Sequence, residues 1–280
     1  LILGHVGSFF LSIVVGVLMF RTGPSMPSRH HFRRLLEYAR YSWLGILESR
    51  AFGWMDTIVL SVFVSSTLVG IYSASWTLAS MLGLISVSIK QTLFPEVSEL
   101  SVKEDYDRIK EVLSDGIAFS GIFAIPGLFG AALLGPELLK IYRPEFSEGG
   151  TVLVILILAR LMSSYGSPLK STINAVDRPD VAFRINGVFV VANLVMNLSF
   201  VTLFGWVGAA VATTFSAGLS MVVSYVALVR IIGSFEVPYL EILRQVAAGL
   251  VMFVAVFGLE RVLPVGHLWT LVSVGAGASV

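Results

Sequence analysis

The sequence predicts an all-α polytopic transmembrane helix bundle of about nine spans. Hydrophobic residues make up 56% of the 280 residues and charged residues 13%, whereas soluble domains hold roughly 25% charged residues. So few charges cannot cover a globular surface in water. The apolar residues also gather into runs close to the ~20 residues that a helix needs to cross the hydrocarbon core.

The predicted spans follow from these runs, taken in chain order. The runs are continuous rather than alternating with period two, which excludes the strands of a membrane barrel. Pro95 ends the third span, Pro126 and Gly127 predict a break or kink in the fourth, and Gly205 makes a tight turn between the sixth and seventh. The spans are residues 2–20, 39–64, 68–93, 113–135, 151–169, 185–203, 207–229, 246–263 and 268–280.

Two further expectations concern the ends of these spans. A capping box from Ser101 to Glu104 predicts a short cytoplasmic helix that leads into the fourth span. The chain opens on Leu1 and stops at Val280 inside an apolar run, so we expect it to be a fragment of a longer protein.

The loop charges predict the orientation. Fourteen of the 19 Lys and Arg residues lie on one side of the predicted spans and three on the other, with two inside spans. Because cytoplasmic loops carry the excess of basic residues, the 21–38, 94–112, 170–184 and 230–245 loops are expected to face the cytoplasm. The net charge of +1 gives no sign of a nucleic-acid partner. The chain has no cysteine and therefore no disulfide or thiolate metal site.

Several segments, in their order and spacing, carry a family resemblance. They are Asp56–Ser61, Val69–Ser75, Leu93–Ser98, Asn174–Pro179 and Gly205–Ala212. Together they resemble the MOP (MATE-like) exporter superfamily, specifically its Wzx-type polysaccharide or lipid-linked oligosaccharide flippases. The resemblance implies the last helix of an N-terminal lobe plus a basic cytoplasmic linker (1–31), a six-helix C-terminal lobe (32–230) and a truncated extra helix pair (231–280). The remainder of the N-terminal lobe would be missing.

The resemblance also implies a function. Such a protein moves a lipid-linked oligosaccharide from the cytoplasmic to the outer leaflet of the cell membrane by alternating access, without a cofactor or a catalysed reaction. Its partners would be the bilayer, the lipid-linked substrate, the missing lobe and a coupling ion, H⁺ or Na⁺. A MATE-type multidrug or cation antiporter is the alternative. A membrane-embedded glycosyl- or prenyltransferase is less favoured, because the sequence shows no catalytic or metal-binding motif.

Two arginines within spans are the first candidates for binding the substrate. A charge at the bilayer centre costs ~2.5–3.5 kcal/mol, so it needs a partner or a hydrated cavity. The planar guanidinium matches a phosphate better than an ammonium does. Arg50 and Arg160 are therefore candidate phosphate-binding cations. The alternative for Arg50 is a structural ion pair with Glu48 or Asp56. The alternatives for Arg160 are a pair with an acid such as Glu48 or snorkelling to a membrane interface.

Polar residues in the second and sixth spans complete the candidates. Glu48 and Asp56 could share a broad helix face, either in a cavity or as structural partners of nearby charges. Asn186, Asn193 and Asn197 fall within about 20° of one line, so they could bind sugar hydroxyls or hold helices together.

A further pattern in the seventh span indicates packing rather than binding. Small residues recur there every four residues and allow close helix contact; they are Gly208, Ala212, Ser216, Ser220 and Ser224.

Overall fold

The structure is a computed structural model that describes residues 7, 11–12, 14–15 and 28–262. Most of the predicted first span and the whole of the ninth lie outside the described residues. The chain divides into two compact units, Leu1–Arg40 and Tyr41–Val280, and the contacts below belong to the second. The domain boundaries expected from the sequence stay a prediction.

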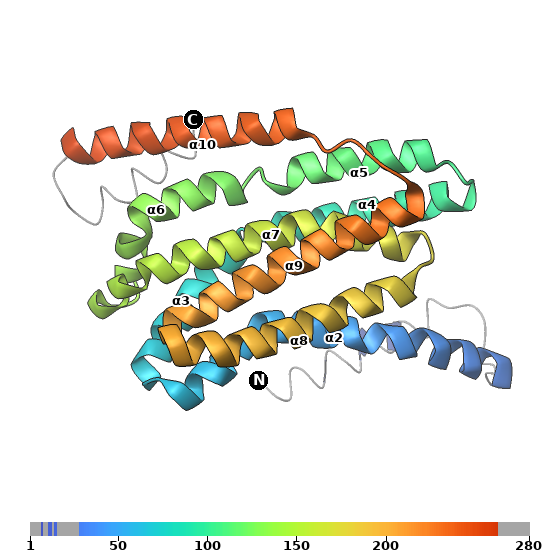
Figure 1. Cartoon of the computed structure of the whole chain (residues 1–280), viewed down its shortest axis with the longest axis horizontal. Coiled ribbons are helices and arrows are strands. Elements are labelled where there is room, and N and C mark those ends of the chain that lie inside the picture. Colours follow the sequence, from blue (N-terminus) through green and yellow to red (C-terminus); the bar gives the residue numbers. More distant parts are fainter. Residues whose placement is uncertain (1–6, 8–10, 13, 16–27, 263–280) are drawn as a thin grey trace. The chain divides into compact units, whose positions relative to one another are not determined.

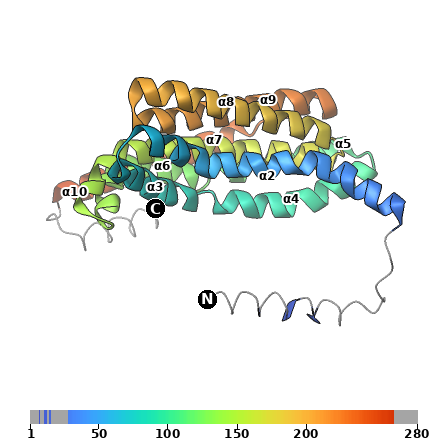
Figure 2. The same ribbon diagram turned by 90° about the horizontal axis from the view of Figure 1, so that it is seen from below.

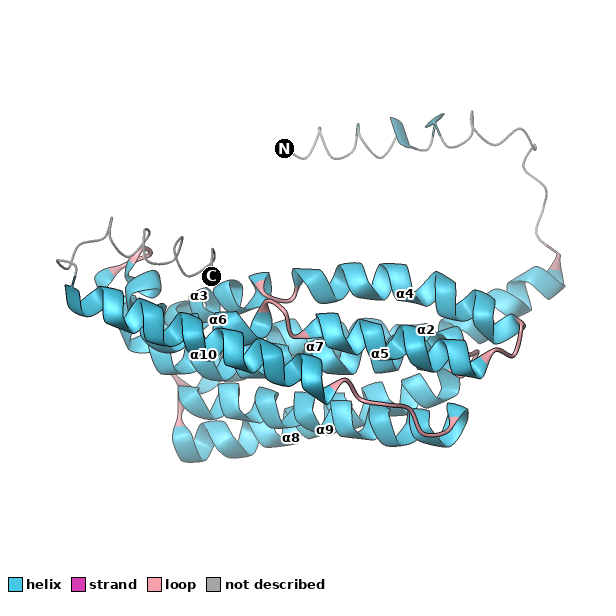
Figure 3. Ribbon diagram, turned by 90° about the horizontal axis from the view of Figure 1, so that it is seen from above, coloured by secondary structure: helices cyan, strands magenta, loops and turns pink. Residues whose placement is uncertain are grey.

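The described residues are helices joined by short turns, as Figure 3 shows, so the all-α prediction is confirmed. The helices are α2 (Arg29–Phe63), α3 (Ser66–Met81), α4 (Leu84–Val102), α5 (Tyr106–Ser120), α6 (Ala124–Lys140), the 3₁₀-helix η1 (Pro144–Gly149), α7 (Gly150–Ala175), α8 (Pro179–Phe204), α9 (Trp206–Ile232) and α10 (Tyr239–Val262).

Five helical stretches of the described chain are long and apolar enough to cross a membrane, or six if the bent pair α3 and α4 makes one span. These stretches cover the predicted third to eighth spans. The predicted second span lies in α2, which does not meet the same test, because Glu48, Arg50 and Asp56 interrupt its apolar stretch. The prediction of nine spans is therefore not confirmed.

The predicted third span is not one straight helix. α3 and α4 meet at Leu82 and Gly83 with a bend of 45°. There the amides of Leu82 and Gly83 donate to carbonyls only three residues earlier, which tightens the turn and ends α3. Pro95 does not end the span as expected but lies inside α4. An interior proline costs about 3 kcal/mol, and the packing of α4 against α5 and α7 offsets this cost.

The expected capping box is wrong as well. Ser101 lies inside α4, and Glu104 adopts a left-handed backbone with φ 58°. The true N-cap of the next helix is Asp105, whose carboxylate accepts the Arg108 amide at 3.2 Å. An aspartate at this position satisfies an amide that has no helical partner.

The fourth span is broken, as its proline predicted. α5 ends at Ser120 and α6 begins at Ala124, so the break lies at residues 121–123. Pro126 is in the first turn of α6, where its missing N–H costs nothing, while its ring would clash with the carbonyl of Ile122 in a continuous helix. Gly205 confirms the expected tight turn with φ 61° and ψ −146° between α8 and α9.

Within the second unit, α7 is the central helix. It packs against α9, α6, α4 and α3, while α8 pairs with α9 and α10 covers α6. Figures 1 and 2 both show α8 and α9 side by side as an antiparallel hairpin. The turns after α4, α7 and α9 lie at one end of the bundle, and those after α6 and α8 at the other (Figure 1). This alternation agrees with the predicted path of the chain through a membrane.

Candidate functional site

A buried carboxylate joins four helices. Asp56 of α2 is only 4% exposed. Its carboxylate accepts hydrogen bonds from the Tyr72 hydroxyl of α3, from Asn197 Nδ2 of α8 at 2.8 Å, and from Thr213 Oγ1 of α9 at 2.7 and 2.8 Å. Asn193 Nδ2 donates in turn to Thr213 Oγ1 at 3.0 Å. We call these five residues the Asp56 cluster.

The Asp56 cluster is incompletely satisfied. The Oδ1 atoms of Asn193 and Asn197 are buried and accept no hydrogen bond in the described chain. No basic side chain pairs with Asp56 among the described residues, so hydrogen bonds from uncharged groups alone would stabilise a negative charge there. The cluster thus gathers hard oxygen ligands, the kind that alkali ions and protons prefer. The sequence placed Asp56, Asn193 and Asn197 on the candidate list but missed Tyr72 and Thr213.

Arg160 lies between aromatic rings. Its guanidinium carbon is 4.3 Å from the Trp76 ring centre and 4.8 Å from that of Phe52. Nη2 donates to Ser80 Oγ at 2.6 Å, and Nε is buried without a partner in the described chain. The aromatic faces attract the cation, but no acidic side chain of the described residues neutralises it. The ion pair with Glu48 that the sequence left open does not form.

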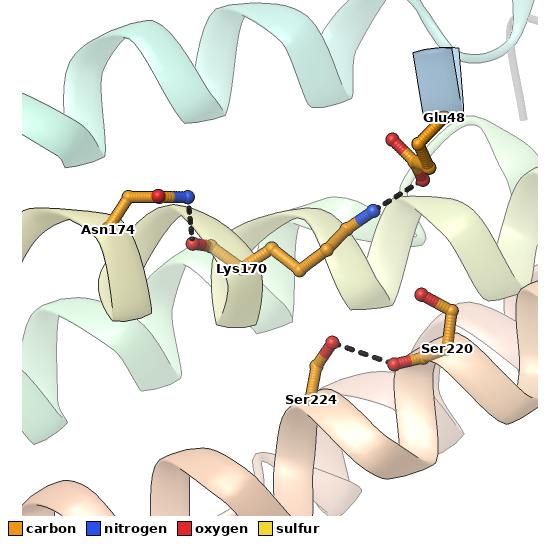
Figure 4. Close-up of polar contacts among 5 residues, drawn as sticks. All are labelled: Glu48, Lys170, Asn174, Ser220 and Ser224. Carbon is orange, nitrogen blue, oxygen red and sulfur yellow. Dashed lines mark hydrogen bonds and ion pairs between the residues drawn. The ribbon is translucent and has the colours of Figure 1, made fainter. Parts of the chain in front are cut away.

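Glu48 pairs instead with Lys170. Lys170 Nζ of α7 is 2.7 Å from Glu48 Oε1 of α2, and the two side chains are 22% and 18% exposed. Figure 4 shows the pair above Ser220 and Ser224 of α9. Glu48, Lys170, Phe52 and Ser220 also line a small pocket between α2, α7, α8 and α9. The sequence placed Lys170 in a cytoplasmic loop and missed it, because α7 runs past the expected end of the span at 169.

The other candidates lie apart from one another. Arg50 is exposed on α2 and makes no ion pair among the described residues. Asn186 is half-buried on α8; a Cβ added at Gly45 would lie 3.4 Å from its Nδ2, and its Oδ1 has no partner in the described part of the chain. The three asparagines therefore share one side of α8, but only two of them join the Asp56 cluster.

The small-residue ridge of α9 is buried along its whole length. At Gly208 an added Cβ would lie 2.0 Å from the carbonyl oxygen of Phe200 in α8. Ser216 Oγ donates to the Ala212 carbonyl and lies 3.7 Å from Met196 Sδ of α8. The ridge therefore allows close contact between α8 and α9, as a small-xxx-small pattern does.

The chain matches a known family of membrane proteins. Residues 4–274 match the family model described as Lipid II flippase MurJ. The chain belongs to the MurJ family. The MurJ family is a branch of the MOP superfamily, so the resemblance of the sequence to that superfamily is confirmed. The more specific assignment to the Wzx-type flippases is not confirmed by this match.

Two archaeal relatives of this MurJ-family chain come from Haloferax volcanii. The probable flippase AglR is 33% identical over 267 residues, which are 94% of this chain and 56% of the relative. The probable low-salt glycan biosynthesis flippase Agl15 is 28% identical over 269 residues, which are 96% of this chain and 57% of the relative. The chain thus spans a little over half the length of these two curated relatives.

A solved structure gives the same picture of the fold. The structure of lipid II flippase MurJ in an inward closed conformation superposes with a TM-score of 0.74 at 17% identity, covering 96% of this chain and 56% of that one. The fold is therefore MurJ-like, and the chain is a multi-pass membrane protein.

Proposed function

We propose that this chain is the C-terminal lobe of a flippase in the cell membrane, which moves a lipid-linked oligosaccharide from the cytoplasmic to the outer leaflet. A polar glycan cannot cross hydrocarbon unaided, so alternating access must open a hydrated cavity to each side in turn. No covalent bond is formed or broken. Membership of the MurJ family and the names of the archaeal relatives support this function. The substrate would be a lipid-linked precursor of a surface polysaccharide or glycan.

The environment of Arg160 is the observation that supports an anionic substrate. Its guanidinium is held by Ser80 and two aromatic faces, but it meets no carboxylate of the described residues. A desolvated cation without a counter-charge favours an anionic ligand, and a guanidinium can bind two phosphate oxygens at once. Arg50 is exposed and unpaired among the described residues, so it is the second candidate cation.

The antiporter alternative needs an acidic side chain free to bind an organic cation. Of the two acidic candidates, Glu48 is paired with Lys170 and Asp56 accepts three hydroxyl and amide donors. The Lys170 ammonium already balances the Glu48 charge. Asp56 is only 4% exposed and is enclosed by four helices, so it suits a proton or a small ion better than an organic cation. A transferase would need a catalytic centre, and the described residues hold no group of three or more His, Cys, Asp or Glu side chains that could bind a metal. These observations favour the flippase over both alternatives.

The Asp56 cluster is the candidate site for the coupling ion. Two orphan amide oxygens and a carboxylate without a cationic partner could accept H⁺ or Na⁺, and the cluster joins α2, α3, α8 and α9. An ion bound there would bias how these helices pack, which is how a gradient could drive alternating access.

The function can be tested by reconstituting the complete gene product in liposomes. The probe is a polyprenyl diphosphate oligosaccharide whose glycan carries a fluorophore that an impermeant reductant quenches. We expect wild-type protein to expose the inner pool of probe. Arg160→Lys should slow this by about tenfold or more, because a charge-assisted hydrogen bond contributes ~1.5–3 kcal/mol. Arg50→Lys should also slow it if Arg50 contacts the diphosphate.

Arg230→Lys is the matched control, since Arg230 is exposed in the last turn of α9. It should flip the probe at the wild-type rate. Rates are normalised to folded protein. If the wild type leaves the probe in its leaflet, the flippase function is wrong. If the wild type is active and both Arg50→Lys and Arg160→Lys keep its rate, the phosphate-binding role of these arginines is wrong.

A further inference from the structure

We propose that Lys170 is the first cation of α7 to meet the anionic head of the substrate, and that Glu48 neutralises it between transport events. The substrate phosphate would then exchange with the Glu48 carboxylate and move on toward Arg160. This inference rests on the proposed function and adds a second anion-binding residue and a path to it.

A polar stripe on α7 connects the two cations. Its members follow one another at intervals of three or four residues and lie within about 80° of one line at 100° per residue. They are Arg160, Ser163, Ser167, Lys170 and Asn174. The first four are half-buried and the last is exposed. An ionisable side chain within a membrane helix faces a partner or a hydrated cavity, so the two cations favour a surface that water or a polar ligand reaches.

The spacing gives the stripe a direction. Ten residues separate Arg160 from Lys170, which is about 15 Å along a helix and half the thickness of the hydrocarbon core. In the predicted orientation, Lys170 lies near the cytoplasmic surface and Arg160 lies near mid-membrane. A diphosphate that enters from the inner leaflet would therefore meet Lys170 first.

The Glu48–Lys170 pair is suited to exchange its anion. Its side chains are 18% and 22% exposed, whereas those of the surface pair Glu99–Lys103 are 70% and 61% exposed. Partial burial strengthens the attraction, but it leaves the ammonium within reach of a ligand. In the described part of the chain, the Lys170 ammonium donates one hydrogen bond, to Glu48. Two of its three N–H groups therefore stay available.

A buried hydroxyl beside the pair also lacks a partner. Ser220 is 5% exposed, and its Oγ makes no hydrogen bond in the described part of the chain. Ser224, one turn further along α9, instead donates its hydroxyl to the Ser220 carbonyl at 2.7 Å. Ser220 lines the same pocket as Glu48 and Lys170, and Figure 4 shows its hydroxyl on the side facing them. It is a donor ready for a phosphate oxygen near Lys170.

Exchange of the Glu48 carboxylate for the substrate phosphate at Lys170 predicts a change in substrate binding that a purely structural ion pair does not predict. If Glu48 competes with the substrate for Lys170, its removal should strengthen substrate binding. Glu48→Gln should lower the probe concentration that gives half-maximal flipping about fivefold, and Lys170→Met should raise it about tenfold, changes typical of a single charge-assisted contact. The double variant should behave like Lys170→Met, and Lys170→Arg should stay close to the wild type.

The assay is the liposome flipping measurement on the complete gene product, with Glu99→Gln and Lys103→Met as controls for removing a Glu–Lys pair. These controls should leave the half-maximal concentration unchanged. The exchange is refuted if Glu48→Gln does not lower that concentration. It is also refuted if both single variants lose folded protein and the double variant regains it, since that is the signature of a structural pair. An inactive wild type would refute the proposed function itself.

A second measurement does not depend on these charge variants. These 280 residues hold no cysteine. With any cysteine elsewhere in the complete gene product replaced by serine, a cysteine at position 167 or 171 can be labelled selectively with an anionic thiol reagent. Ser167 is half-buried on the stripe, whereas Ser171 is 1% exposed beside it. We expect labelling at 167 that the polyprenyl diphosphate probe suppresses, and little labelling at 171. Labelling at 167 that the probe leaves unchanged would refute the path.

Discussion

The contact between α8 and α9 gives a prediction whose size follows from the structure. A Cβ added at Gly208 would lie 2.0 Å from the carbonyl oxygen and 2.4 Å from the carbonyl carbon of Phe200. Side-chain Cβ atoms essentially never come within 3.0 Å of such atoms, so Gly208→Ala must move α8 and α9 apart by at least 1 Å. The obstacle is backbone, which cannot rotate away, and overpacking of this kind costs ~1–3 kcal/mol or more.

Gly218 is the matched control for Gly208. It lies on the same helix, and an added Cβ would meet nothing within 4 Å. There the same substitution should be neutral or stabilise the helix by ~0.5–1 kcal/mol. The thermal midpoint of unfolding in detergent can be measured by size-exclusion chromatography of a fluorescent fusion. We expect Gly208→Ala to lower this midpoint and Gly218→Ala to keep or raise it. Equal midpoints for the two variants would refute the close packing of this hairpin.

Two further predictions concern orientation and coupling. Cysteines placed at the exposed Glu104, in the turn after α4, and at the exposed Glu148, in η1, should differ in intact cells. An impermeant thiol reagent should label 148 and not 104, and the reverse pattern would invert the predicted topology. A Na⁺ or H⁺ gradient should accelerate flipping by the wild type, and Asp56→Asn should remove that acceleration while the nearby Ser61→Ala keeps it. An Asp56→Asn variant that still responds to the gradient would exclude the cluster as the coupling site.

The sequence predicted the positions of the third to eighth spans well because a long apolar run has few alternatives in a bilayer. It did less well at breaks. No proline lies at the bend between α3 and α4, at Leu82 and Gly83, so the sequence did not predict it. Pro126 did predict the break before α6. The capping box at Ser101 was a valid local pattern, but α4 continued through it and Asp105 took the N-cap. Such choices depend on which helix packs best against α7, and a local pattern does not hold that information.

The candidate site shows the same limit. Periodicity places Asn193 and Asn197 on one side of α8, yet it cannot bring Asp56, Tyr72 and Thr213 to them from three other helices. Those contacts come from the packing of α2, α3, α8 and α9. Lys170 was missed for a simpler reason, since α7 continues six residues beyond the predicted end at 169. Its spacing of ten residues from Arg160 was nonetheless visible in the sequence.

Proline inside three helices has a mechanical consequence. Pro95, Pro136 and Pro168 lie within α4, α6 and α7, and both α4 and α6 contact α7. A helix bends most easily where a proline interrupts its hydrogen-bond ladder. Between Pro168 and Ala175, α7 rises about 10 Å, so bending there by about 20° would carry its end sideways by about 4 Å. Lys170 lies in this last segment and Arg160 before it, so a bend would change the distance between the two cations without unfolding either half of the helix.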